Sequence, residues 1–263
     1  MSSDKGKLMR NQQTNYPHGN TNEIISMKTK YTNIAALTCA SLLGSAALSQ
    51  AALTVGGIIS VNFANSATGG PDYGATMSGA AVVGSAGDTW NNITGTGGFA
   101  PLSSTLNLTD GFSSGVGLNI GTGTYNSSDS TGTTLDVFKG NIYLAGTGTN
   151  TAISLTGFSA GQLVDLYLYA AAGHTAGEGA TFDFGSIKTT TDSAVQETAY
   201  VEGSNYVKYA SLAADGTGTI NGTWTVGANY SSFAGFQVVA VPEPSAALLG
   251  GLGMLCLLRR RRA

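Results

Sequence analysis

The most regular pattern in the chain is an alternation of apolar and polar residues with a period of two. Ile59, Val61 and Phe63 alternate with polar neighbours. Because successive side chains of a β-strand point to opposite faces, this pattern predicts a strand with one buried face. It recurs at Val116, Leu118 and Ile120, at Ile153 and Leu155, and at Val164, Leu166 and Leu168. Further strands are predicted at residues 182–184, 206–210, 219–226 and 233–240.

The segments between these strands are rich in Gly, Ser, Thr and Asn, and residues 52–240 contain no sustained apolar periodicity of the helical kind. Many short strands with glycine-rich turns are typical of an antiparallel β-sandwich or jelly roll. A parallel β-helix is the competing architecture, but the regular repeat that it requires is not visible. We therefore expect an all-β fold, an antiparallel β-sandwich or jelly-roll ectodomain over residues 52–240.

The last 23 residues, 241–263, have a different pattern. Prolines flank Glu243, and because proline fixes φ and has no backbone N–H, the segment around it should be extended and unpaired. Thirteen uncharged residues and four arginines follow. The segment comprises the motif Val241, Pro242, Glu243, Pro244 and Ser245, an apolar anchor with Ala246, Leu248, Leu249, Leu252, Leu255, Leu257 and Leu258, and the basic stop Arg259, Arg260, Arg261 and Arg262.

The apolar run is short for a membrane helix. Thirteen residues span about 20 Å as a helix, against a hydrocarbon core of about 30 Å. Arginine snorkelling and local thinning of the bilayer can close this gap. By the positive-inside rule, the arginines stay in the cytoplasm and the preceding chain lies outside.

In its order of motif, apolar helix and basic end, this tail resembles the PEP-CTERM sorting signal of envelope-bearing bacteria. The resemblance covers only residues 241–263. It implies that an exosortase reads and cuts the tail, so that an inner-membrane-anchored precursor becomes a protein of the cell surface or extracellular matrix. The alternative is an ordinary C-terminal anchor that is never cut.

The other end of the chain resembles a secretory signal. Residues 1–26 are polar and are interpreted as a mis-called extension, with Met27 as the preferred start. A basic segment and the apolar stretch 34–48 lead to small residues at the positions that signal peptidase reads, so residues 27–51 are expected to be removed before Ala52. An unusually long leader is the alternative. A lipidated Cys39 is disfavoured, because Thr38 is large for the preceding position.

The predicted ectodomain is acidic and lacks cysteine. Its basic residues are Lys139, Lys188 and Lys208, and against these three stand twelve acids, for a formal charge of −9. Nucleic acid is therefore excluded as a partner, because binding phosphates requires a basic surface. Without disulfides, the domain must be stabilised by its core or by a bound ion.

A second resemblance concerns the ectodomain. The order of the strand 151–155, a Gly-Phe-Ser-Ala-Gly turn at 157–161, the strand 164–169 and a closing stretch 235–239 is similar to the galactose-binding-like jelly-roll domains of secreted bacterial proteins. It covers about half of the domain and transfers no binding residue. A shared fold does not establish a shared function.

Catalytic candidates are few. His174 is the only histidine in residues 52–240, and the glycines around it argue against a helix that would align it with Glu178. No Gly-x-Ser-x-Gly elbow between a strand and a helix is present to supply a serine nucleophile. Asp165, Glu178 and Asp183 are a candidate carboxylate set for glycoside hydrolysis if folding brings two of them within about 5–10 Å. The alternative is that these acids only solvate the surface.

Calcium is a candidate structural ion. The loops containing Asp110 and Asp129 offer oxygen ligands of the type that calcium binds, without the spacing of an EF-hand. Asp, Asn and Gly are equally typical of tight turns, so turn formation is the alternative explanation.

Aromatic residues offer the remaining evidence for binding. Tyr167 and Tyr169 alternate with Leu166 and Leu168, which places both tyrosines on the face opposite the leucines, together with Asp165. Aromatic rings beside polar groups can hold the apolar face of a neutral sugar. Packing within the protein is the alternative role, as expected for Trp224.

These observations favour a structural or adhesive surface protein associated with extracellular polysaccharide or biofilm, with weak glycan binding and no catalytic activity. Two alternatives stay open. One is a glycan-processing hydrolase that uses a carboxylate pair, and the other is a surface-coat protein without a ligand.

Overall fold

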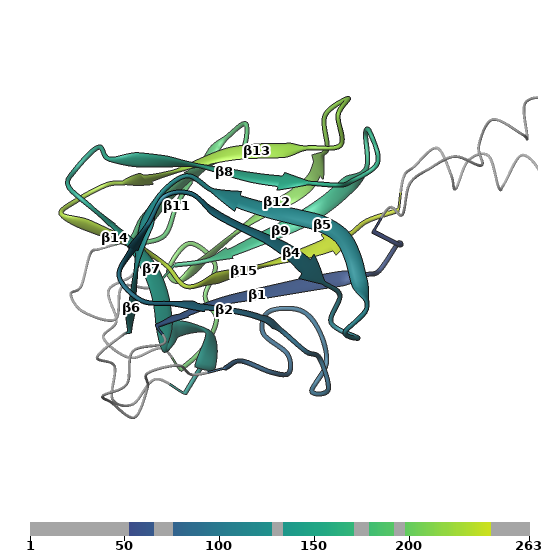
Figure 1. Cartoon of the computed structure of the whole chain (residues 1–263), viewed down its shortest axis with the longest axis horizontal. Helices are drawn as coiled ribbons and strands as arrows, with labels where there is room; N and C mark the ends of the chain where they lie inside the picture. Colours follow the sequence, from purple (N-terminus) through teal and green to yellow (C-terminus); the bar gives the residue numbers. More distant parts are fainter. Residues whose placement is uncertain (1–52, 66–75, 128–133, 171–178, 192–197, 243–263) are drawn as a thin grey trace, which may run out of the picture. The chain divides into compact units, whose positions relative to one another are not determined.

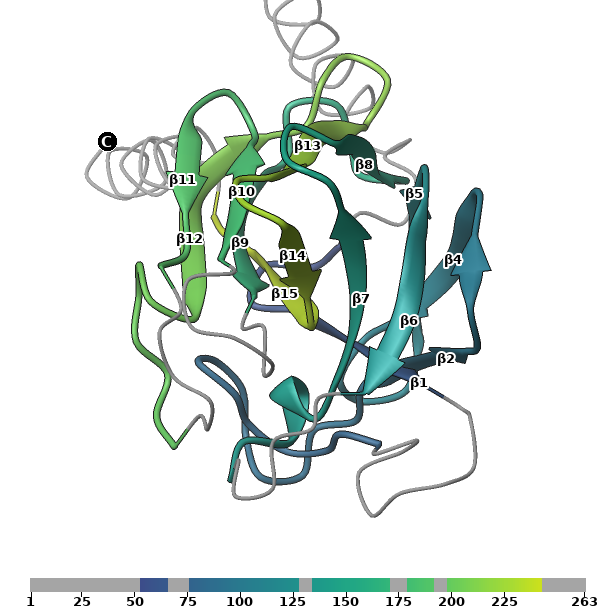
Figure 2. The same ribbon diagram turned by 90° about the vertical axis from the view of Figure 1, so that its left-hand side faces the viewer.

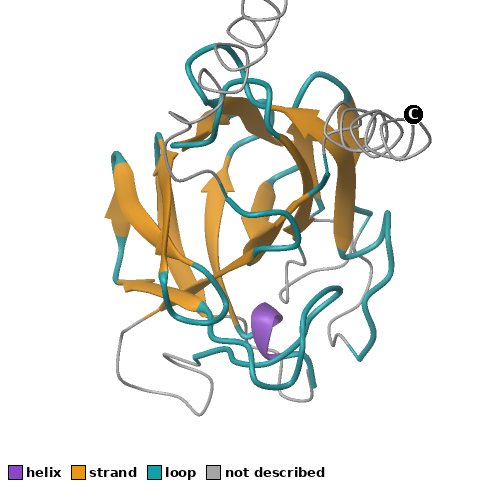
Figure 3. Cartoon of the chain, turned by 90° about the vertical axis from the view of Figure 1, so that its right-hand side faces the viewer, coloured by secondary structure: helices purple, strands orange, loops and turns teal. Residues whose placement is uncertain are grey.

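Alternating apolar side chains produce β-strands throughout the computed structural model, which describes residues 53–65, 76–127, 134–170, 179–191 and 198–242 (Figure 1). These residues form fifteen strands and a single 3-10 helix, η1 (Asp136–Phe138). Figure 3 shows these strands joined by loops, with one short helix in the described part of the chain. The predicted all-β class is thus confirmed.

The strands form three sheets. The first has five strands in the order β12 (Tyr206–Ala213), β9 (Leu163–Tyr169), β15 (Gly235–Ala240), β1 (Ile58–Asn65) and β2 (Asn91–Gly95). The second has six, in the order β11 (Ile187–Thr189), β10 (Ala180–Asp183), β13 (Ile220–Val226), β8 (Asn150–Thr156), β5 (Ser113–Ile120) and β4 (Leu102–Asn107). The third has four, β14 (Tyr230–Phe233), β7 (Gly140–Ala145), β6 (Gly123–Ser127) and β3 (Gly98–Phe99).

Antiparallel pairing of strands far apart in sequence holds these sheets together. In the five-stranded sheet, β15 pairs with β9 on one side and with β1 on the other. The pair β1 and β2 is parallel, unlike the purely antiparallel sandwich expected from the sequence. Its strands are joined by the long crossover of residues 66–90, as a parallel pair requires. The topology is not that of a parallel β-helix.

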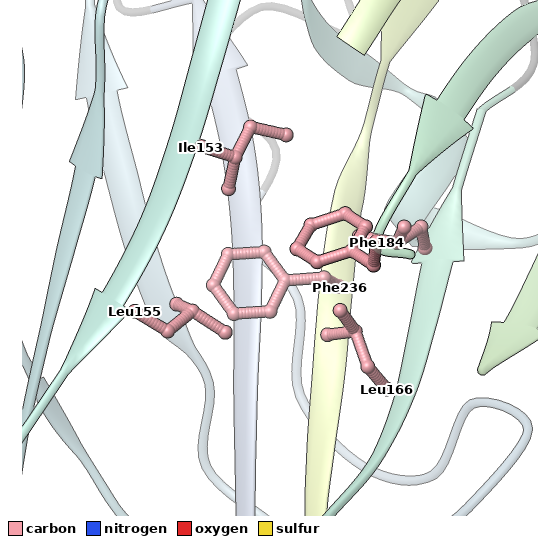
Figure 4. Close-up of a pocket in the computed structure, with 6 residues that line it drawn as sticks. Ile153, Leu155, Leu166, Phe184 and Phe236 are labelled. Atoms are coloured by element: carbon pink, nitrogen blue, oxygen red, sulfur yellow. The ribbon is translucent and has the colours of Figure 1, made fainter. Parts of the chain in front are cut away.

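The main core lies between the five-stranded and six-stranded sheets. Phe236 from β15 and Leu166 from β9 meet Ile153 and Leu155 from β8 and Phe184, which follows β10 (Figure 4). Together with Leu168 they line an apolar pocket that does not admit a water-sized sphere. This densely packed region removes apolar surface from water and so stabilises the fold.

The five-stranded sheet is buried on its outer face as well. In β1, Ser60 and Asn62 are as fully buried as Ile59 and Val61. The expectation that β1 is half-buried is therefore wrong. A second apolar cluster covers this face with Met77, Trp90, Val137, Phe138 and Ala234, packed around Tyr167 and Tyr169.

Residues 1–26 and the predicted signal segment 27–51 lie outside the described residues. Of the tail, only Val241 and Pro242 are described, so the predicted C-terminal helix lies outside this part of the chain. Within the described ranges, no helix is long and apolar enough to cross a membrane.

Replacing Phe236 with Ala is expected to destabilise the fold by about 3–5 kcal/mol, because the side chain is 1% exposed and fills the space between the two sheets. Chemical unfolding of the chain, followed by the fluorescence of its buried tryptophans, measures the change. Phe112, which is 72% exposed, is the matched control, and Phe112→Ala should cost less than about 0.5 kcal/mol. Similar losses for both variants would contradict this core.

Candidate functional site

The predicted sorting motif begins directly after the last described strand, β15. The N–H of Ala240 donates to the carbonyl oxygen of Gly57 at 3.1 Å, and the N–H of Val241 donates to that of Leu163 at 3.1 Å. Pro242 follows, is exposed and has no N–H to donate, so strand pairing cannot continue. The motif is therefore joined to β15 without an intervening linker.

The structure brings together Asp165 and Tyr167 on the outer face of β9, as the alternation predicted. Lys208 lies opposite Tyr167 on β12. Its ammonium is 2.7 Å from a carboxylate oxygen of Asp165 and 5.1 Å from the centre of the Tyr167 ring. The other carboxylate oxygen of Asp165 accepts the N–H of Ser211 at 2.9 Å. Sequence reasoning missed Lys208, which is separated from Asp165 by 43 residues.

These contacts determine the charge state of Asp165. Burial raises the pKa of its carboxyl, but hydrogen bonds from Lys208 and Ser211 and the lysine charge outweigh that effect, so the pKa lies below its usual value. The hydrogen bond to Asp165 correspondingly raises the pKa of Lys208. The pair is therefore fully ionised at neutral pH, with the negative charge of Asp165 already balanced by a cation.

Tyr169 takes part in a closed hydrogen-bond network. Its hydroxyl donates to the side-chain oxygen of Gln237 at 2.5 Å and accepts the N–H of Val82 at 3.3 Å. The amide nitrogen of Gln237 donates to the hydroxyl of Ser60 at 2.9 Å and to the carbonyl oxygen of Val83 at 3.1 Å. Burial raises the pKa of the Tyr169 hydroxyl well above its usual value.

Aromatic rings complete the enclosure of Tyr169. Trp90, Phe138, Tyr200 and Tyr206 have their ring centres between 5.6 and 6.5 Å from that of Tyr169. Tyr169 is 0% exposed and Tyr167 is 7% exposed. The open aromatic platform expected from these two tyrosines is therefore not present on this face, because residues of the second cluster cover it.

The other predicted acids do not meet at one described site. Asp183 ends β10 in the six-stranded sheet, whereas Asp165 lies in the five-stranded sheet. One oxygen of Asp183 accepts the N–H of Gly185 at 2.9 Å, and Asp110 likewise accepts the N–H of Phe112 at 3.0 Å. Both carboxylates therefore hold local turns.

Three further predicted residues, Asp129, His174 and Glu178, lie outside the described residues. Among those that are described, no group of three or more His, Cys, Asp or Glu side chains is placed to hold a metal ion. Calcium binding stays a prediction, as does the carboxylate pair.

Replacing Asp165 with Asn is expected to lower stability at neutral pH by about 1 kcal/mol and to flatten its fall in acid. The carboxyl pKa is lower in the folded than in the unfolded chain. Its stabilising contribution is thus present above the unfolded value of about 4 and is lost as the pH falls through the folded value. Thermal unfolding midpoints, recorded from neutral to acidic pH, measure this effect.

Lys208→Met removes the other partner and should give a similar loss at neutral pH. If the pair acts as a unit, the double variant should be no less stable than the weaker single variant. Additive losses would show that the two side chains contribute separately.

Comparison with known proteins identifies the tail. Residues 240–262 match the family described as the PEP-CTERM protein-sorting motif. No curated protein matches the chain in sequence. Among solved structures, the enzymatically active domain of tailspike protein 4 from bacteriophage CBA120 aligns with 53% of this chain and 18% of its own, at 12% identity and a TM-score of 0.23. This similarity is too low to confirm the jelly roll.

The motif at residues 240–262 implies recognition by exosortase and an exported, membrane-anchored precursor that is sorted to the cell surface.

Proposed function

We propose that the chain is a structural or adhesive component of the cell surface whose β-sandwich associates with extracellular polysaccharide. The observation that carries the proposal is the junction at Val241 and Pro242, where the sorting motif follows the central strand β15 directly. Processing there would release the folded domain intact, because no part of the described sheets lies beyond the motif's first residues.

A non-catalytic role is supported by the way in which the described carboxylates are used. Asp165 is paired with Lys208, and Asp110 and Asp183 accept backbone N–H groups in turns. Asp215 holds a third turn, with one oxygen accepting the N–H groups of Thr217 and Thr219 at 2.8 and 3.0 Å. Burial raises the pKa of Asp165, but the hydrogen bonds and charge of its partners outweigh that effect and lower it, and the hydrogen bonds from Thr217 and Thr219 lower the pKa of Asp215. A general acid must instead be protonated at the working pH.

The carbohydrate partner is proposed from the location at the cell surface and from the negative charge of residues 52–240. A surface with many hydroxyl and amide groups and an excess of negative charge is suited to neutral rather than acidic polymers. An acidic polysaccharide would need bridging cations, for which calcium is the candidate.

Changing Pro242 and Pro244 together to Ala is expected to prevent cutting of the tail, because these prolines are what predicts an extended, unpaired segment around Glu243. Intact mass of the cell-associated protein measures the result. The unmodified chain should lack the mass of the apolar and basic tail, and the double variant should retain it. A full-length mass for the unmodified chain would favour the uncut anchor and contradict processing.

Purified protein should be retained by the producing cell's own exopolysaccharide in a pull-down assay. The assay is run with calcium and with chelator, and retention at least ten-fold above that of an unrelated protein of similar charge is expected. Loss of retention in chelator would identify calcium as the bridge, and Asp110→Asn then tests the turn between β4 and β5. Absence of retention in both buffers would contradict the adhesive role and favour a coat protein without a ligand.

A further inference from the structure

The outer face of the four-stranded sheet combines aromatic rings with polar groups that make no hydrogen bond. Register and burial define this face. Ile142 and Leu144 of β7 point into the main core, together with Phe233 of β14. The alternate residues therefore point outward, and Figure 2 looks onto β14, β7 and β6 from that side.

The outward residues of β7 and β14 form a patch in which exposure falls from Tyr230 to Asn141. Tyr230 is 47% exposed and Tyr143 is half-buried, and their ring centres lie 6.0 Å apart with the planes inclined by 66°. Ser232 lies directly opposite Tyr143, and Asn141 is the next outward residue of β7. Since outward positions repeat about every 7 Å along a strand, the four side chains span roughly 14 Å.

The two polar residues of this patch, Asn141 and Ser232, are buried and make no side-chain hydrogen bond. Asn141 is 1% exposed and Ser232 is 4% exposed. Neither the amide nitrogen nor the amide oxygen of Asn141 has a hydrogen-bond partner, and the hydroxyl of Ser232 has none. Each such group costs about 1–3 kcal/mol when buried, and such groups are rare in folded proteins. Apolar residues of the same size would avoid that cost, so we infer that these polar atoms serve a function other than stability.

The chemistry of these groups indicates the class of ligand. An amide supplies donors and an acceptor, a hydroxyl supplies both, and two tyrosine rings supply apolar faces. The strands that carry them, β7 and β14, contain no charged residue, and neither does the neighbouring strand β6. This set matches the hydroxyls and apolar ring face of a neutral sugar, and it offers no charged group to balance a uronate or a metal cation.

We propose that Tyr143, Tyr230, Asn141 and Ser232 form the binding site for a neutral oligosaccharide, a conclusion that rests on the proposed association with polysaccharide. Tyr230 and Tyr143 stack on the sugar, and Asn141 and Ser232 bind its hydroxyls. Because the polar atoms are shielded from bulk water, binding involves a side-chain adjustment at the site, as is common at interfaces.

Binding is tested with the full chain in a detergent that has no sugar headgroup. The probes are neutral hexasaccharides of glucose, galactose and mannose, with a galacturonate hexasaccharide as the charged control. Calorimetric titration should detect at least one neutral probe and no binding of the galacturonate. Tyr230→Ala should weaken that binding at least ten-fold, whereas Phe112→Ala, which removes an exposed aromatic ring from the β4–β5 turn, should leave it unchanged.

Asn141→Leu separates binding from structure. If the amide serves a ligand, this change of similar size should abolish binding while the unfolding temperature stays the same or rises, because an unpaired buried polar group is removed. A fall in the unfolding temperature would show that the amide supports the fold, and would overturn its assignment as a ligand-binding group. Unchanged binding with the Asn141→Leu or Tyr230→Ala variant would overturn the site.

Failure of the site can be distinguished from failure of the proposed function. If none of the three neutral probes binds but exopolysaccharide still retains the protein, the site is wrong and the adhesive role stands. If exopolysaccharide does not retain the unmodified protein, the proposed function itself is contradicted.

Discussion

Burial of β15 on both faces is the constraint on which the rest of the structure depends. Phe236 and Val238 on its inner face pack in the main core, and both are at most 1% exposed. On its outer face, Gln237 is fully buried and joins Tyr169, Ser60 and Val83 through its amide. A buried polar residue at the centre of a sheet is costly unless it is hydrogen-bonded, and each amide atom of Gln237 has two partners.

This arrangement also explains how the sorting tail is attached. A strand that is paired on both edges and packed on both faces cannot be withdrawn without breaking the domain. The motif follows that strand at once, so the segment that implies recognition by exosortase is joined directly to the central strand of the five-stranded sheet. Pro242, the second residue of the motif, ends the strand pairing, because it has no backbone N–H to donate.

Sequence periodicity predicted the inner faces well, since Val61, Leu166 and Ile153 each alternate with polar or small neighbours and all reach the core. Periodicity failed for strands that carry apolar or aromatic side chains on both faces. In β7, Tyr143 on the outer face obscures the alternation of Ile142 and Leu144, and this strand was not predicted. The burial of Tyr169 depends on residues 77–90, which carry no regular pattern and reach their place through long-range packing.

The contrast between two outward faces decides where a ligand is to be sought. On the five-stranded sheet, the hydroxyl of Tyr169 and the amide of Gln237 satisfy each other and the backbone above them, so nothing is left to bind a sugar. On the four-stranded sheet, Asn141 and Ser232 are equally buried yet make no such bonds. Buried polar groups are costly unless they are paired. The unpaired groups of Asn141 and Ser232 on the four-stranded sheet can therefore still bind a ligand, whereas those of Tyr169 and Gln237 on the five-stranded sheet are already paired.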